Sequence, residues 1–263
     1  MIVALSDATI HATATNDRCA AIGGTIASDP DASESTPRRV IPHGRLASTS
    51  MPLRYPPLDI AVHTPRLSLI GATDDWLERL VPAVRDGIVE RDAAPFDDPM
   101  SLYLPSPERA WRWLQGIWAG RGRVSPEFWR LYFVVVVDRE PVGMQDLIGV
   151  DFAAYGTVTT FSWLRPDHRG QGLGHEMRSA VLHLAFDGIS AREATSEAFI
   201  DNHASTAVSR SLSYEPNGAG WATRRGQPAL LQRWRLSRET WERHRRDDID
   251  LDGVVAALPV LGL

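Results

Sequence analysis

The chain has 263 residues, 43% of them hydrophobic, which is enough to bury the core of one α/β domain. Its net charge of −5 argues against a nucleic-acid partner, and its single cysteine, Cys19, excludes a disulfide framework and a cysteine-based metal site. All 28 basic residues are arginines, so chemistry that needs a lysine amine is excluded as well.

No apolar run approaches the roughly 18 residues that a membrane span needs. Residues 1–5 lack the charge and the length of a signal peptide. We therefore expect a cytoplasmic protein without a membrane partner.

Three stretches follow one another along the chain. Residues 1–50 are rich in Ala, Ser, Thr and Asp without sustained periodicity, which is typical of a flexible tail. Residues 56–245 carry the patterns of a folded domain. Residues 246–263 carry four aspartates between Asp247 and Asp252 and then turn apolar, which favours a loosely packed terminal tail, with a partner-docking segment as the alternative.

Within the domain, hydrophobic patterns predict alternating strands and helices. Strands are expected near residues 65–70, 130–138, 141–152, 157–164, 192–199 and 228–236. Helices are expected near residues 73–90, 106–120, 172–187, 203–213 and 237–246. This order indicates an α/β protein of the α+β type, with a mixed, mostly antiparallel sheet flanked by helices on both faces.

The run Arg169-Gly170-Gln171-Gly172-Leu173-Gly174 joins the expected strand 157–164 to the next helix. A glycine-rich turn before a helix directs unpaired N–H groups and the positive end of the helix dipole to one point, which favours phosphate binding. A dinucleotide fingerprint would need glycine at His175, a P-loop would need a lysine, and a methyltransferase-like run would need an acid at His168. The remaining pattern is Arg/Gln-x-x-Gly-x-Gly/Ala.

This pattern resembles the acetyl-CoA-binding motif of the GCN5-related N-acetyltransferases (GNAT family). Further resemblances follow in the family's order: Thr64-Pro65-Arg66-Leu67-Ser68-Leu69, Asp138-Arg139-Glu140-Pro141-Val142-Gly143, Asn202-His203-Ala204-Ser205 and Leu212-Ser213-Tyr214. The first of these is similar to the subgroup of ribosomal-protein N-terminal acetyltransferases. One departure is Ser213, where the family has glycine, so the helix exit is strained if it needs positive φ.

The resemblance implies a site for acetyl-CoA as co-substrate. Its pyrophosphate would lie on Arg169, Gly170, Gln171, Gly172, Leu173 and Gly174, and its pantetheine arm on Asn202 and Ser205. Backbone N–H groups of Ser162, Trp163 and Leu164 would face the thioester carbonyl where two strands separate. The Trp163 side chain is then either a wall of the acyl site or part of the core.

The catalytic residues are less clearly marked. The position where many relatives have a tyrosine acid holds Ser209, whose hydroxyl is a weak proton donor. The alternative is that Ser209 is an ordinary helix serine without a catalytic role. Glu197 and Asp151 lie on strands expected to border the cleft, and either could act as a general base through a water; each could equally be a surface or pairing residue. His168, His175 and His183 share no metal-ligand spacing, so no metal is expected.

The expected activity is transfer of an acetyl group to a primary amine, on a protein N-terminus or a small molecule. The acidic loop 92–100, with Phe96 among its aspartates, would suit a cationic acceptor, and the alternative is an ordinary solvated loop. A non-catalytic acetyl-CoA sensor or partner-binding module is the alternative. Trp111 and Trp118 share one helix face, which is typical of core packing or of a homodimer contact.

Overall fold

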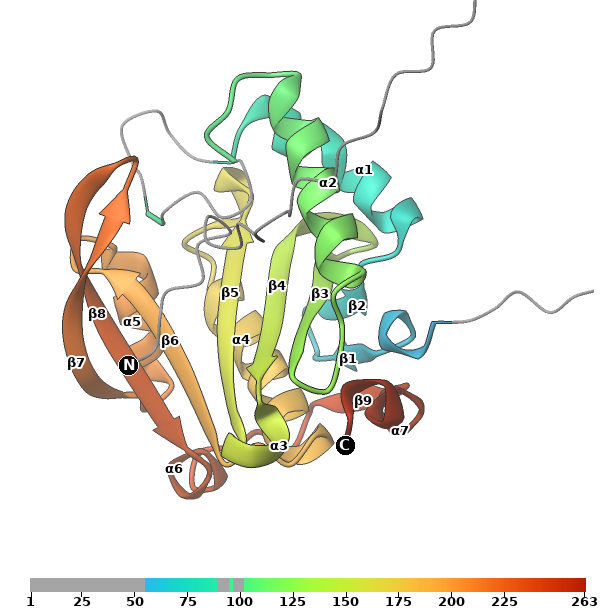
Figure 1. Cartoon of the computed structure of the whole chain (residues 1–263), viewed down its shortest axis with the longest axis vertical. Helices are drawn as coiled ribbons and strands as arrows, with labels where there is room; N and C mark the ends of the chain where they lie inside the picture. The colour runs from blue at the N-terminus through green and yellow to red at the C-terminus, as the bar shows by residue number, and fades with distance from the viewer. Residues whose placement is uncertain (1–54, 89–94, 97–101) are drawn as a thin grey trace, which may run out of the picture. The chain divides into compact units, whose positions relative to one another are not determined.

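The computed structural model describes residues 55–88, 95–96 and 102–263. The expected tail 1–50 and most of the acidic loop lie outside the described residues. Figure 1 shows the described domain as one large sheet with helices on both faces, which confirms the expected fold class.

The strands of this domain form one sheet in the order β7-β8-β6-β5-β4-β3-β2-β1-β9. Their bounds are β1 Ala61–His63, β2 Ser68–Gly71, β3 Phe128–Val137, β4 Glu140–Val150, β5 Thr157–Leu164, β6 Glu193–Phe199, β7 Glu215–Arg224, β8 Gln227–Ser237 and β9 Asp250–Asp252. Among the described strands, β5 and β6 form the one parallel pair, and all other neighbours are antiparallel.

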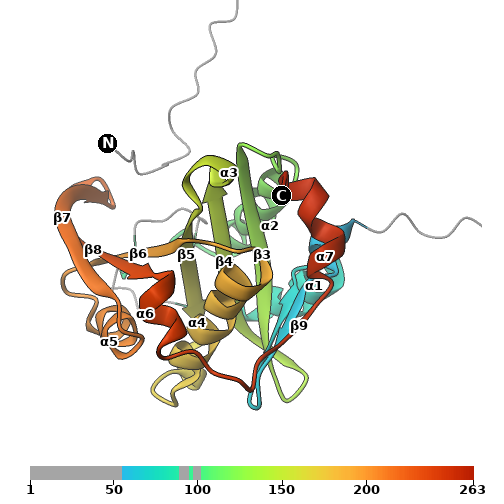
Figure 2. The same ribbon diagram turned by 90° about the horizontal axis from the view of Figure 1, so that it is seen from below.

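The helices lie on both faces of the sheet, α1 and α2 on one face and α4 on the other (Figures 1 and 2). Their bounds are α1 Asp74–Asp86, α2 Glu108–Arg121, α3 Phe152–Tyr155, α4 Leu173–His183, α5 His203–Ser211, α6 Arg238–Glu242 and α7 Val254–Ala257, with a π turn at Leu184–Gly188 and short 3₁₀ turns at Pro56–Leu58, Pro166–His168 and Leu258–Leu261. None of the helices in the described ranges is long and apolar enough to cross a bilayer.

Two apolar cores result from this arrangement because successive strand residues point to opposite faces. Phe133 and Val135 of β3 belong to a core that includes α4, whereas Val134 and Val136 belong to a second core with α1 and α2. The second core includes the fully buried Trp113, while Trp111 and Trp118 are exposed on the outer face of α2.

The C-terminal stretch differs from the expected loose tail. Strand β9 pairs with β1 through Leu251 and Val62, at the edge of the sheet. Val254, Ala257 and Leu261 are buried in the core shared with α4. A three-residue strand and one helical turn are too short to show periodicity, so their packing could not be foreseen from the local sequence.

Candidate functional site

The sheet splits between the parallel strands β5 and β6. They pair only from Thr157↔Glu193 to Thr159↔Thr195 and then separate, although both continue, to Leu164 and Phe199. Residues 160–164 and 196–199 therefore border a gap, which we call the fork. The fork ends beside the glycine-rich turn that follows β5.

The backbone of β5 presents hydrogen-bond donors to the fork. Arg165 donates its N–H to Val142 O of β4 at 2.8 Å. Because backbone groups alternate in direction along a strand, the N–H of Trp163 also faces β4, whereas those of Ser162 and Leu164 face the fork. The expected contribution of the Trp163 N–H is therefore wrong, and its side chain, 4% exposed, belongs to the core with α1 and α2.

The glycine turn, residues 170–174, has the backbone shape of an anion cradle. Gly170 (φ +72°) and Gly172 (φ +80°) lie in the left-handed region that favours glycine. A Cβ atom on Gly172 would lie 3.3 Å from the Arg66 guanidinium. Within the described chain, no hydrogen bond is recorded from the N–H groups of residues 170–174, which lie at the N-terminus of α4.

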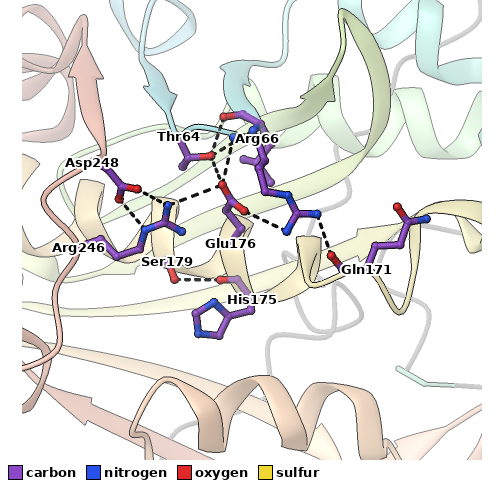
Figure 3. Close-up of polar contacts among 9 residues, drawn as sticks. Thr64, Arg66, Gln171, His175, Glu176, Ser179, Arg246 and Asp248 are labelled. Atoms are coloured by element: carbon purple, nitrogen blue, oxygen red, sulfur yellow. Dashed lines mark hydrogen bonds and ion pairs between the residues drawn. The ribbon is translucent and has the colours of Figure 1, made fainter.

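A buried carboxylate on α4 holds this turn in place (Figure 3). Glu176 Oε1 accepts hydrogen bonds from Thr64 Oγ1 at 2.7 Å and from Arg66 N at 3.2 Å. Its oxygens also lie 3.5 Å from Arg66 Nη1 and 3.8 Å from Arg246 Nη2. Arg66 Nη2 in turn donates to Gln171 O at 2.8 Å. The β1–β2 hairpin and the segment before β9 thus meet at the glycine turn through one side chain.

The electrostatics of the turn follow from this network. Desolvation lowers the pKa of His175, and the Arg246 charge lowers it further, while Glu176 opposes both. The lowered pKa favours the uncharged form of His175, and the cationic group beside Gly172 is that of Arg66.

Arg169 contributes differently from the expected phosphate contact. Its guanidinium donates to Leu164 O, from Nε at 2.9 Å and from Nη2 at 2.7 Å, and also to Ile88 O. The side chain therefore ties the end of β5 to the segment after α1. The carbonyl groups that it binds set where β5 turns into the glycine turn.

Asn202 and Ser205 start the helix on the other side of the fork. Asn202 Oδ1 accepts from Ser205 N at 3.1 Å, which caps α5, and its Nδ2 donates to Pro95 O at 3.0 Å. Phe96 packs edge-on against Phe161 of β5. The described part of the acidic loop thus lies beside the fork, on the face of α1 and α2.

The three expected catalytic residues are not brought together. Ser209 is fully buried in α5, and its hydroxyl has no recorded hydrogen-bond partner among the described residues. Glu197 lies on the open part of β6, 3.3 Å from Arg233 Nε. Asp151 follows β4, two residues beyond the last pair with β5, Gly149↔Val158. It therefore lies at the opposite end of β5 from the glycine turn, roughly 20 Å away at about 3.3 Å per residue. This separation from the glycine turn argues against Asp151 as the general base.

One carboxylate that was not foreseen lies closer. Asp146 of β4, 1% exposed, is paired across strands with Phe161 and accepts from Arg130 Nη2 at 2.6 Å. Burial raises its pKa, and the Arg130 charge opposes that shift. A charged residue inside the apolar run 140–150 was the sequence signal that could have found it. In the described ranges, no three His, Cys, Asp or Glu side chains form a metal-binding group.

Comparison with known proteins now gives the class. Residues 66–215, more than half of the chain, match the family model described as an acetyltransferase (GNAT) domain. The chain belongs to this family: it is an acyltransferase, of a family whose co-substrate is acetyl-CoA.

Solved structures agree on the fold. Mycobacterium smegmatis RimJ in complex with CoA-disulfide is similar with a TM-score of 0.60 and 15% identity, over 68% of this chain and 88% of that one. RimL, a ribosomal L7/L12 alpha-N-protein acetyltransferase in complex with CoA, has a TM-score of 0.55 and 19% identity, over 66% and 95%. The microcin C7 self-immunity acetyltransferase MccE, in complex with acetyl-CoA and AMP, has a TM-score of 0.54 and 11% identity, over 66% and 93%.

Proposed function

We propose that this protein transfers an acetyl group from acetyl-CoA to a primary amine, on a protein N-terminus or a small molecule. The observation that carries the proposal is the fork, which opens in the sheet directly beside the glycine turn. One end of the fork can hold a pyrophosphate, and its wall can anchor a thioester.

The residues present fit acetyl-CoA. The glycine turn offers N–H groups without recorded partners in the described chain, with the Arg66 guanidinium next to Gly172. The donors for the thioester carbonyl are the N–H groups of Ser162 and Leu164, which are fixed in position by the β4–β5 pairing. Asn202 and Ser205 would contribute by placing the start of α5 against the pantetheine arm.

The acceptor amine would approach from the face of α1 and α2. That side of β5 carries Phe161, against which Phe96 packs, and the Asp146–Arg130 pair lies next to it. Glu197, on the open part of β6, is the expected carboxylate that could take the amine proton through a water. Similarity to ribosomal-protein acetyltransferases such as RimL supports a protein N-terminus as one acceptor class.

A binding experiment tests the cofactor site. Gly172→Glu adds a side chain and a negative charge where the pyrophosphate would lie, so the CoA affinity measured by calorimetry should fall more than about 100-fold, or about 2.7 kcal/mol. Gly116→Glu is the matched control, because a Cβ at Gly116 of α2 meets nothing within 4 Å. A folded Gly172→Glu protein with the affinity of the wild type would refute the proposed site.

A turnover experiment tests the reaction. Release of free thiol from acetyl-CoA should depend on an added amine, and a panel of peptides with free N-termini and of small amines should reveal the acceptor class. Tight CoA binding without thiol release for any amine would instead favour a binding module.

A further inference from the structure

Arg178 of α4 is a buried cation without a matching anion. It is 5% exposed, and its recorded hydrogen bond runs from Nη1 to Ser196 Oγ at 3.1 Å. Among the described residues, no carboxylate forms an ion pair with it, and its Nε has no recorded partner. A buried charge without compensation is costly to folding, so its presence needs a reason outside the resting fold.

The Arg178 contact lies where the fork begins. Ser196 directly follows Thr195, the last residue of β6 that pairs with β5. Thr159 and Thr195 share the other face, where their hydroxyls are 2.8 Å apart. Since side chains alternate, Ser196 and Thr160 both point towards α4, at the apex of the fork.

Two further hydroxyls belong to this group. Thr160 Oγ1 and Tyr214 Oη are buried and have no recorded partner by hydrogen-bond geometry in the described chain. Burial raises the pKa of Tyr214, whereas the nearby Arg178 charge and hydrogen bonding with Arg178 and Thr160 oppose that shift. We call Arg178, Ser196, Thr160 and Tyr214 the apex cluster. It combines one positive charge with three hydroxyl groups.

An apex with this composition suits an anion that forms during acyl transfer. In thioester aminolysis, the amine nitrogen bonds to the carbonyl carbon, and the carbon–sulfur bond breaks. Sulfur keeps the electron pair as a thiolate, and the nitrogen proton passes to a base or to water. If the carbonyl oxygen faces Ser162 and Leu164 N–H, the sulfur bonded to the same carbon also lies in the fork.

We infer that the apex cluster stabilises the leaving thiolate of CoA, with Arg178 as a positioning residue that acts through Ser196. Arg178 donates to Ser196 Oγ, which leaves the Ser196 hydroxyl hydrogen free to be donated to a ligand on the α4 side of the fork apex. The guanidinium also polarises that hydroxyl in a medium of low dielectric constant. This inference rests on the proposed function and explains how a weak acid such as Ser209 suffices, because a stabilised thiolate can leave without being protonated.

The direct test is the ionisation of CoA bound to the whole protein, followed by the ultraviolet absorbance of the thiolate. On the wild type, the pKa of the bound thiol should lie at least about 1 below the value of free CoA measured in the same buffer. Arg178→Met should return it towards that value, and Ser196→Ala should do the same with the arginine still present. Arg85→Met, which changes an exposed arginine of α1, should leave it unchanged.

Kinetics supply a second readout. Arg178→Met should slow transfer from acetyl-CoA about 10- to 100-fold, and the deficit should shrink with acetyl thioesters whose thiols are more acidic. Arg178→Lys should recover part of the rate. A deficit that is the same for all leaving groups would show a merely structural role and overturn the inference.

Two other outcomes distinguish this inference from the proposed function. A wild-type protein that does not bind CoA would overturn both. CoA bound with an unperturbed thiol pKa would overturn this inference alone, as would an Arg178→Met protein that loses only the use of a dicarboxylic acyl-CoA such as succinyl-CoA.

Discussion

Two buried charged residues on the same helix, Glu176 and Arg178, have opposite surroundings. Glu176, 4% exposed, has a hydroxyl, a backbone N–H and two guanidinium groups around it. Arg178, 5% exposed, has neutral hydroxyl groups around it, that of Ser196 at 3.1 Å and that of Tyr214 nearby, and no carboxylate among the described residues. They are two residues apart, yet one is compensated on every side and the other is not.

This difference indicates a structural role for Glu176 and a ligand-directed role for Arg178. A carboxylate with its charge matched contributes to one fixed arrangement, here of the glycine turn and the two segments beside it. A cation left with a hydroxyl retains its electrostatic potential for a ligand. The comparison predicts that the two sites respond differently when their partners are removed.

The largest effect is expected on the Glu176 side. The double variant Arg66→Met/Arg246→Met leaves a buried carboxylate without its cations, so the free energy of unfolding in urea should fall by about 3 kcal/mol. Arg243→Met is the control: it breaks an exposed pair with Glu239 and should cost less than about 0.5 kcal/mol. Equal losses in the two proteins would contradict the structural role of Glu176.

A single hydroxyl on each side gives a sharper contrast. Thr64→Val removes the donor to Glu176 and should cost about 1–2 kcal/mol of unfolding free energy. Tyr214→Phe removes a hydroxyl that makes no hydrogen bond of ordinary geometry to the described residues. The free energy of unfolding, measured by thermal denaturation, should therefore change by less than about 0.5 kcal/mol. The contrast fails if the two substitutions destabilise the protein alike.

The pH dependence of stability should reflect the Glu176 network through His175. Its pKa is lowered in the folded protein, so its contribution to stability is present above the unfolded pKa of about 6.5 and is lost as pH falls through the lowered value. Urea unfolding between about pH 7.5 and 5 should therefore lose less stability in His175→Gln than in the wild type. Parallel curves for the two proteins would argue that His175 is not desolvated.

The smallest change in stability is expected at Arg178 itself. Arg178→Met replaces an unmatched buried cation with an apolar side chain, so the unfolding free energy should stay within about 1 kcal/mol of the wild type or rise. Calorimetry without ligand measures this directly. A loss of several kcal/mol would show that Arg178 stabilises the resting fold and that the contrast with Glu176 is false.

Much of the frame of the site could be predicted from the sequence. The β-branched run 157–164 is β5, and the glycine turn begins α4 as its pattern indicated. Ser213 adopts a φ of +63°, so the helix exit does need the positive φ that is strained for a serine in place of glycine. These features are local, so a short window of residues contains the information that determines them.

The remaining features depend on contacts between distant segments. Strand β7 was missed because Pro216, Gly218 and Gly220 obscure its pattern, and pairing with β8 holds it in the sheet. A glycine motif does not reveal that Arg169 binds carbonyl groups or that Arg246 reaches Glu176. Helix α4 is buried on all sides, because Trp241 and Arg246 from later segments cover its outer face. Its sequence therefore has no clear amphipathic period that would distinguish Arg178 from an exposed arginine.

The pairing of β1 with β9 also has a consequence for folding kinetics. Ala61 and Asp252 are partners although 191 positions separate them (252 − 61), so this contact closes almost the whole described domain into a loop. Loop-closure entropy makes such long-range contacts unfavourable until the intervening chain is ordered. The short β1–β9 ladder should therefore form late, and Arg246, just before β9, would reach Glu176 only then. The glycine turn would acquire its final rigidity among the last steps of folding.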